Sequence, residues 1–204
     1  MNKQPKYKIC RRVGEAVFSK CESPRFAASA EKKRPKKKGA GRALSEYGTQ
    51  LLDKQRVRYT YNLRERQFAR YVEKAATKKG VTPAEYLYRT LEARLDNVVY
   101  RLGFTQSRAS ARQMVSHGHI VVNEKKVNLP SYAVRTGDIV RVRKESKDKA
   151  LFAALPERLK DRITPSWLVL DEKKMEGVIK TEPVPDKAGG GIGVLTSVLG
   201  FYGR

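Results

Sequence analysis

A serine followed by two arginines at helical spacing forms a candidate anion-binding site near the middle of the chain. Ser107 is a residue type that caps helices, and Arg108 and Arg112 lie one turn apart after it. The first turn of a helix carries unpaired amide groups, which favour an anionic group such as a phosphate. Ala111 and Met114 fall on another side of this helix and can pack on a core. We therefore expect both arginines to face a polyanion.

Two histidines and two lysines follow the same segment. His117 and His119 flank Gly118, and Lys125 and Lys126 come a few residues later. A catalytic base would need an orienting carboxylate and an enclosed pocket, and the sequence suggests neither. We expect these side chains to add donors and positive charge to the anion site, with helix-end packing as the alternative for the histidines.

The two cysteines, Cys10 and Cys21, are too few for a structural zinc site. Such a site has four ligands, and no histidine precedes His117. Two cysteines are also fewer than the disulfide framework of a small secreted domain requires. We expect structural thiols, no bound metal and no cofactor.

The charge of the chain favours a polyanionic partner. The 204 residues include 44 Lys and Arg against 21 Asp and Glu, a formal net charge of +23. Bound cations release the counterions that condense on a nucleic acid, so excess positive charge strengthens such binding. The sequence contains no apolar run long enough to span a membrane and starts without the apolar core of a signal peptide. We expect a cytoplasmic protein with no membrane partner.

The elements that position these residues follow from periodicity. Residues 1–44 are strongly basic without apolar periodicity, so we expect an extended arm that orders on its partner. Residues 45–95 predict a helical lobe, with a helix capped by Ser45, another beginning at Asn62 and a third running from Pro83 to Gly103. Residues 146–163 predict a further helix. The prolines and glycines beyond Gly177 indicate an irregular tail, and we expect residues 145–204 to pack on the helical lobe.

Residues 96–144 change from helical to strand periodicity. Apolar residues alternate in 119–122, around Val127 and in 139–144, with turns at 123–124 and 137–138. The predicted fold class is α+β, a helical lobe with an inserted module of two helices and a small twisted antiparallel sheet.

The stretch 92–144 resembles the small RNA-binding module named after ribosomal protein S-four. The matching positions are Arg94-Leu95-Asp96, Leu102-Gly103, Ser107-Arg108, Ala111-Arg112-Gln113, 117–123, Val127, Pro130-Ser131 and Gly137-Asp138. Several protein families carry this module. Residues 44–76 upstream are also similar to the helical region of the ribosomal protein S-four family, at Leu44-Ser45, Tyr47-Gly48, Gln50-Leu51, Lys54-Gln55, Arg58, Tyr61, Gln67-Phe68 and Tyr71. The resemblance covers about residues 1–180.

Two features depart from that family. Many members carry four N-terminal cysteines spaced as a zinc knuckle, and this chain has only Cys10 and Cys21. The family usually ends in an acidic, apolar segment near a Phe-Tyr pair. This chain keeps Phe201 and Tyr202 but has AGGGIGVLTSVLG before them.

The resemblance implies a structural, non-enzymatic constituent of the small ribosomal subunit that binds rRNA early in assembly. It further implies contacts with ribosomal protein S-five and other small-subunit proteins, and with mRNA where it enters the ribosome, in a region that contributes to translational fidelity. The residues expected to bind rRNA are Arg11, Arg12, Lys36, Lys37, Lys38, Arg42, Tyr47, Lys54, Gln55, Arg56, Arg58, Ser107, Arg108, Arg112, Gln113, His117, His119, Asn123, Lys125 and Lys126.

Other proteins with the same module provide the alternatives. A pseudouridine synthase would need a separate catalytic domain with an essential aspartate, and the 60 residues after 144 are too few for one. A stalled-ribosome or heat-shock factor would leave residues 44–91 unexplained.

Overall fold

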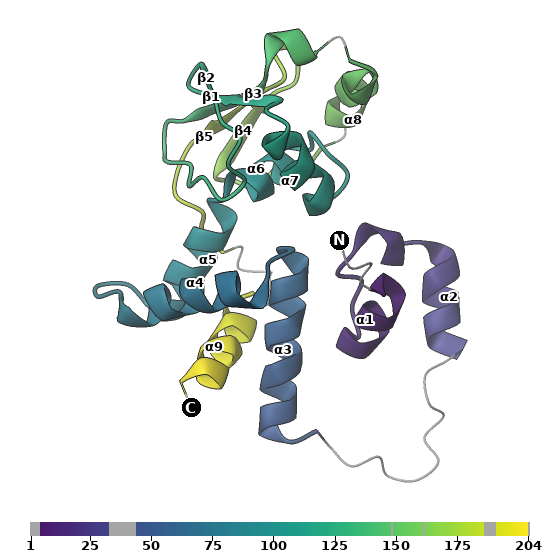
Figure 1. The fold of residues 1–204 in the computed structure, drawn as a ribbon, viewed down its shortest axis with the longest axis vertical. Coiled ribbons are helices and arrows are strands. Elements are labelled where there is room, and N and C mark those ends of the chain that lie inside the picture. The colour runs from purple at the N-terminus through teal and green to yellow at the C-terminus, as the bar shows by residue number, and fades with distance from the viewer. Residues whose placement is uncertain (1–4, 33–43, 148, 161, 186–190, 204) are drawn as a thin grey trace.

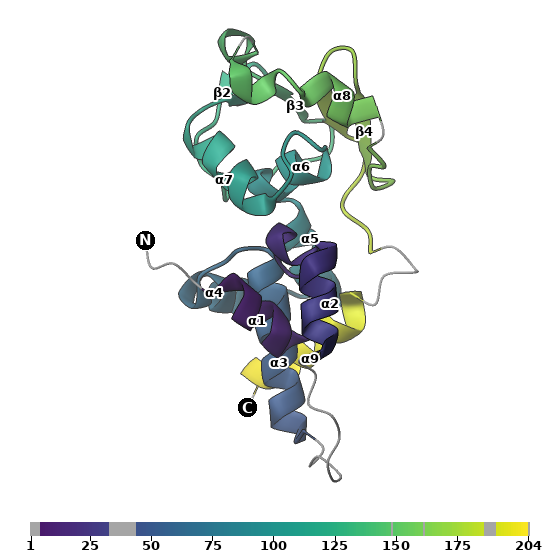
Figure 2. The ribbon, with the colours of Figure 1, turned by 90° about the vertical axis from the view of Figure 1, so that its right-hand side faces the viewer.

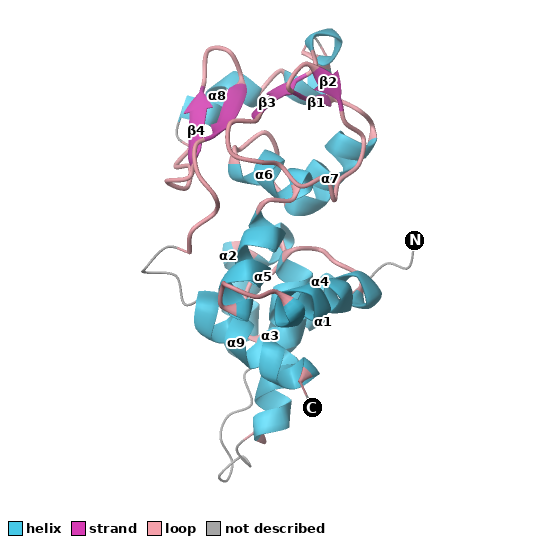
Figure 3. Ribbon diagram, turned by 90° about the vertical axis from the view of Figure 1, so that its left-hand side faces the viewer, coloured by secondary structure: helices cyan, strands magenta, loops and turns pink. Residues whose placement is uncertain are grey.

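The chain folds into a helical lobe and a second lobe that holds the sheet. The computed structural model describes residues 5–32, 44–147, 149–160, 162–185 and 191–203. Figure 1 shows α3 (Glu46–Thr60), α4 (Glu65–Thr77), α5 (Pro83–Glu92) and α9 (Gly191–Tyr202) below the sheet lobe. Figure 3 shows the drawn strands confined to the upper lobe, beside α6 (Leu95–Arg101), α7 (Arg108–Ser116) and α8 (Leu155–Lys160). The predicted α+β fold class is confirmed.

The helical lobe buries the apolar faces that the periodicity predicts. Phe68 and Val72 of α4 pack against Leu87 and Leu91 of α5, and all four side chains are buried. The Ser45 side chain accepts a hydrogen bond from the Gly48 amide (3.2 Å), which confirms the predicted cap of α3.

The C-terminal residues correct the prediction of an irregular tail. Residues 191–202 form α9, which packs along α3 and α5 and buries Leu195 and Val198 in the helical core. Its glycines lower helix propensity, but burial of an uncharged, apolar segment outweighs that cost. The part of the glycine run before Gly191 lies outside the described residues.

The sheet is antiparallel, with strand order β2-β1-β3-β5-β4. Its strands are β1 (Ile120–Val122), β2 (Lys125–Lys126), β3 (Ile139–Val142), β4 (Leu168–Asp171) and β5 (Glu176–Ile179). In β3, Val140 and Val142 are fully buried while Arg141 points to the other face, as the period of two predicts. The structure places β5 against β3, so the sheet extends beyond the predicted module.

Residues 145–179 therefore belong to the sheet lobe, and the expectation that they pack on the helical lobe is wrong. Phe152, Leu155, Leu159 and Trp167 are buried in the core that α6, α7 and the strands share. In place of one helix over 146–163, the chain forms short 3-10 turns, η2 (Lys144–Ser146) and η3 (Ala150–Phe152), and then α8. Folding into short elements lets all of these large apolar side chains reach the sheet core. A single exposed helix would bury less of their apolar surface.

The predicted helix from Pro83 to Gly103 is interrupted between the lobes. Arg94 is extended, which separates α5 from α6. The amides of Leu95 and Asp96 donate to the carbonyls of Tyr132 and Pro130 (2.8 and 3.1 Å). Pairing with a segment almost forty residues away replaces helical hydrogen bonds at this point.

The predicted start of the second helix is also corrected. Asn62 has a left-handed backbone conformation with φ of +52°, and α4 begins at Glu65 rather than at Asn62.

The N-terminal segment contains helices, so the expected extended arm is wrong for its described residues. The elements are α1 (Lys6–Val13), η1 (Ser19–Cys21) and α2 (Pro24–Lys32). Figures 1 and 2 show α1 beside α3, and in Figure 1 α2 lies on the far side of α1. Cys10 and Cys21 are buried and joined by a disulfide bond, which corrects the expectation of structural thiols. Tyr7 also stacks on Phe26, with ring centroids 5.3 Å apart. These local contacts hold a basic segment in a folded form.

Contacts with α3 anchor this segment to the helical lobe. Phe18 packs against Tyr59 with ring centroids 5.9 Å apart, and Glu15 forms an ion pair with Arg56 at 2.8 Å. The predicted RNA contacts Lys36, Lys37, Lys38 and Arg42 lie outside the described residues.

Candidate nucleic-acid interface

A buried carboxylate, that of Glu92, joins the two lobes at the end of α5. It is fully buried and accepts hydrogen bonds from the Tyr61 hydroxyl (2.6 Å), Asn97 Nδ2 (3.0 Å) and Arg101 Nε and Nη2 (2.9 and 2.8 Å). Burial alone would raise the pKa of Glu92, but the hydrogen bonds and charge of Arg101, followed by the Tyr61 hydrogen bond, lower it overall. Burial and the neighbouring Glu92 raise the pKa of Tyr61. The carboxylate is thus ionised and fully paired at neutral pH.

Arg108 extends this network to α7. Its Nε donates to Asn97 Oδ1 at 2.8 Å, and its guanidinium lies over the rings of Tyr100 (4.4 Å) and Tyr61 (5.2 Å). The Asn97 amide group donates to Glu92 and accepts from Arg108, so both of its ends are used. The expectation that the Arg108 side chain is free of contacts within the fold is therefore wrong.

A second set of buried hydrogen bonds lies nearby. Arg94 is 1% exposed and donates to both oxygens of Asp96 (3.0 and 2.6 Å) and to the Tyr71 hydroxyl (2.6 Å). Arg112 lies 3.6 Å from Asp96 Oδ2, and its side chain keeps 38% exposure. Arg112 is partly paired but can still reach a phosphate.

The predicted RNA contacts of α3 are engaged inside the helical lobe. Lys54 is 8% exposed, forms an ion pair with Glu65 (2.9 Å) and lies 4.4 Å from the Phe201 ring centroid. Arg58 reaches the other oxygen of Glu65 (3.2 Å) and donates two hydrogen bonds to Gln55 Oε1. These contacts fix α3 against α4 and α9.

Two further predicted contacts of α3 also have partners within the protein. Arg56 pairs with Glu15 and Asp53, and Tyr47 packs against Phe201 with ring centroids 5.4 Å apart. Tyr47 nevertheless remains 51% exposed, so part of its ring faces solvent.

The predicted residues of the module divide into structural and solvent-facing groups. Ser107 caps α7 by accepting from the Ser110 amide (3.2 Å), as predicted. Asn123 shapes its turn, because its side chain donates to Asp138 (2.7 Å) and accepts from the Ile139 amide (2.9 Å). His119 is half-buried, with Nδ1 3.0 Å from the Ser146 hydroxyl. The exposed predicted residues, in the module and on α1, are Gln113, His117, Asn123, Lys125, Lys126, Arg11 and Arg12.

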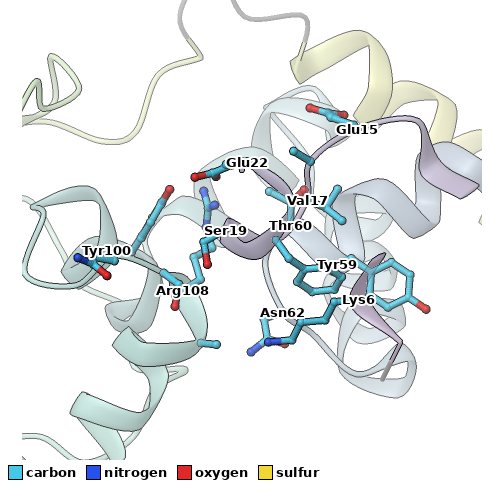
Figure 4. Close-up of a pocket in the computed structure, with 15 residues that line it drawn as sticks. Lys6, Glu15, Val17, Ser19, Glu22, Tyr59, Thr60, Asn62, Tyr100 and Arg108 are labelled. Carbon is cyan, nitrogen blue, oxygen red and sulfur yellow. The ribbon is translucent and has the colours of Figure 1, made fainter. Parts of the chain in front are cut away.

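A cavity of about 290 Å³ lies where the N-terminal segment, α3 and α7 meet. Figure 4 shows Lys6 and Ser19 of the N-terminal segment, Tyr59 of α3, Tyr100 of α6 and Arg108 of α7 around it. Two neighbouring hollows continue past Gln106, which lines all three, and the farthest reaches His117 and His119. Sequence reasoning missed Gln106 and Arg158 in these hollows, because neither belongs to a periodic or charged pattern.

The surface around His117 and His119 is positive. Burial, followed by the charges of Lys149, His117 and Arg143, lowers the pKa of His119. No described carboxylate forms an ion pair with Lys125, Lys126 or Lys149. Within the described ranges, no group of three or more His, Cys, Asp and Glu side chains could hold a metal ion. A search of the same ranges finds no helix with the length and apolarity to cross a membrane.

Comparison with known proteins identifies the family. Residues 1–92 match the ribosomal protein S4/S9 N-terminal domain, and residues 93–140 match the S4 domain. A relative from Pelotomaculum thermopropionicum is 43% identical over 184 residues, which cover 88% of each chain. One from Chromobacterium violaceum is 46% identical over 183 residues, covering 88% of this chain and 87% of its own. Both are named small ribosomal subunit protein uS4.

The chain belongs to the uS4 family of small ribosomal subunit proteins. This confirms the resemblance recognised in the sequence and the prediction that the chain is not an enzyme, since its relatives are named as proteins of the ribosomal subunit. The part of the chain that matches the S4 domain ends at Val140, within β3. The structure adds β4, β5 and α8 to that lobe.

Replacing the buried carboxylate should destabilise the fold. We expect Glu92→Gln to lower the free energy of unfolding by roughly 3–5 kcal/mol, because Arg101 would lose its partner beside a buried network. Denaturant unfolding at pH 7 measures this. Glu85→Gln on the same helix is the control: Glu85 pairs with Arg89 at a partly exposed site, so its loss should cost about 1 kcal/mol or less.

The Glu92→Gln variant also has a predicted pH dependence relative to the native chain. The pKa of Glu92 lies below its usual value of 4.5 in the folded state, so the unfolded state binds the proton more readily. The stabilisation is complete above pH 4.5 and is lost as the pH falls through the lower folded-state pKa. Unfolding of the native chain should therefore become easier on acidification, and the difference from Glu92→Gln should shrink. A difference that stays constant down to pH 2 would contradict this role of the carboxylate.

Arg108 and Arg112 should respond differently to removal. Arg108→Ala leaves the buried Asn97 oxygen without its donor, so we expect a loss of about 1–3 kcal/mol in unfolding free energy. Arg112→Ala removes a longer, partly exposed pair and should cost about 1 kcal/mol or less. Urea unfolding of both variants tests this, and equal effects would show that Arg108 is not part of the junction.

Proposed function

We propose that the chain is a structural constituent of the small ribosomal subunit that binds its rRNA directly. The observation that carries this proposal is the set of exposed cations and donors along α7 and β2. Lys125 and Lys126 form the exposed edge strand β2, and no described carboxylate neutralises them. The net charge of +23 also favours binding to a polyanion such as rRNA.

The sheet lobe supplies one part of the proposed RNA surface. Gln113 and His117 lie exposed on α7, and Arg112 keeps more than a third of its side chain in solvent. The Lys126 side chain packs so closely against Gly118 that a Cβ atom at that position would collide with it. Since Gly118 lies between His117 and His119, the lysine side chain is next to both histidines. Phosphate and ribose contacts by such groups read the shape of folded RNA more than its sequence.

The N-terminal segment supplies the second part. Arg11 and Arg12 are exposed in the last turn of α1, and we include Lys36, Lys37, Lys38 and Arg42 because of the basic run they form in the sequence. Arg108, Lys54, Arg56 and Arg58 serve the fold, and we assign them a supporting role.

Family resemblance supports the finer parts of the proposal. We infer binding early in assembly, a position next to ribosomal protein S-five and other small-subunit proteins, and a contribution to fidelity where mRNA enters. The proposed location is the ribosome in the cytoplasm.

Salt dependence tests direct rRNA binding. The logarithm of the affinity of the chain for small-subunit rRNA should fall steeply against the logarithm of salt concentration. Lys125→Ala with Lys126→Ala should reduce the slope by about two units, one for each lost phosphate contact. The melting midpoint should change little, because both side chains are exposed.

The opposite edge of the same sheet provides the control. Lys173 and Lys174 are exposed in the turn between β4 and β5, and their replacement by Ala removes the same charge. We expect the slope to stay near the native value. A flat native slope, or equal losses in the two double variants, would contradict the proposed surface.

A further inference from the structure

The farthest of the three hollows has an apolar floor and a polar rim. It has a volume of about 240 Å³ and lies between the turn after α6, the outer side of α7 and residues 151–158. Phe104 and Met114 are buried beneath it, and Leu151 stands at its edge with 57% exposure. The volume is smaller than the roughly 300–1,000 Å³ of pockets that hold drug-sized ligands, which suits a single planar group.

Two glutamines at the rim can read the edge of a planar ligand. Gln106 and Gln113 are exposed, and neither side chain has a hydrogen-bond partner among the described residues. A glutamine amide offers a carbonyl acceptor and two donors, a combination that matches the donor and acceptor pattern of a nucleobase edge. His119 binds Ser146 through Nδ1, so Nε2 remains for a ligand.

The charge around this hollow favours an attached phosphate. Arg158 donates to the Phe104 carbonyl (3.2 Å) and has no ion pair with a described carboxylate. Lys149 and Lys126 do not line the hollow, but their positive charges lie close enough to lower the pKa of His119. The cavity in Figure 4 is less suited to a phosphate, because the carboxylates of Glu15 and Glu22 line it and would repel the negative charge.

We propose that this hollow binds one unstacked nucleotide of RNA. The base enters between Leu151 and the floor at Met114, the amides of Gln106 and Gln113 read its edge, and Arg158 neutralises its phosphate. Unpaired bases in single-strand RNA sites stack on aromatic side chains, and His117 and His119 supply such rings at this hollow. The inference rests on the proposed function, since the nucleotide belongs to the rRNA that the chain binds.

Site-specific photo-crosslinking on the full chain tests the pocket. A benzophenone side chain is introduced at Gln113 or at Leu151, and crosslinks to small-subunit rRNA are mapped. Both positions should reach the same unpaired nucleotide. The control is Ile163, which is 92% exposed and lines none of the three hollows, and which should not crosslink to that nucleotide.

An abasic replacement then measures the contribution of the base. Removing the base of the crosslinked nucleotide should weaken binding of the native chain by about tenfold. The double variant Gln113→Ala with Leu151→Ala should bind unmodified rRNA about tenfold more weakly and lose nothing further with abasic rRNA. Because both side chains are exposed, its melting midpoint should match the native value.

The outcomes separate the two proposals. Steep, salt-dependent rRNA binding without a common unpaired nucleotide, or with the same abasic penalty in native and variant chains, overturns the nucleotide pocket alone. Absence of rRNA binding by the native chain overturns the proposed function and the pocket with it.

Discussion

The relation between the two lobes depends on one buried negative charge. Glu92 ends α5 of the helical lobe and receives hydrogen bonds from Tyr61 of that lobe and from Asn97 and Arg101 of α6. Arg108 joins through Asn97, so the helix that carries the proposed RNA surface is connected to the same group. An ionised carboxylate in the interior is tolerable only with such complete pairing. The pairing therefore fixes how α7 is presented relative to the N-terminal segment and α3.

Local patterns in the sequence predicted the elements well where neighbours along the chain decide them. The caps at Ser45 and Ser107 and the alternation of Val140 and Val142 are such cases. The interruption at Arg94 was missed because its cause is a hydrogen bond from Leu95 to the distant Tyr132. The placement of β5 beside β3 and of α9 on α3 depends in the same way on partners that periodicity does not reveal.

The candidate site was predictable in residue type but less so in role. Lys125 and Lys126 lie in an exposed edge strand, so charge alone was enough to predict their place on the proposed RNA surface. Arg108 and Lys54 have the same charge, yet the tyrosines and carboxylates around them make them part of the fold. Repulsion among cations predicted an extended N-terminal arm, but Cys10, Cys21 and the Tyr7–Phe26 stack hold α1 and α2 together. Gln106 and Arg158 carried no signal, since only the fold brings them to one hollow.

The most direct test of this account is hydroxyl-radical footprinting of small-subunit rRNA during titration with the native chain and with Glu92→Gln, at a temperature where both are folded. If the buried network sets the lobes in one arrangement, all protections by the native chain should follow a single binding curve. In the variant, protections should separate into two groups with different midpoints. A single curve with the native midpoint for the folded variant would contradict the claim that Glu92 organises the proposed RNA-binding surface.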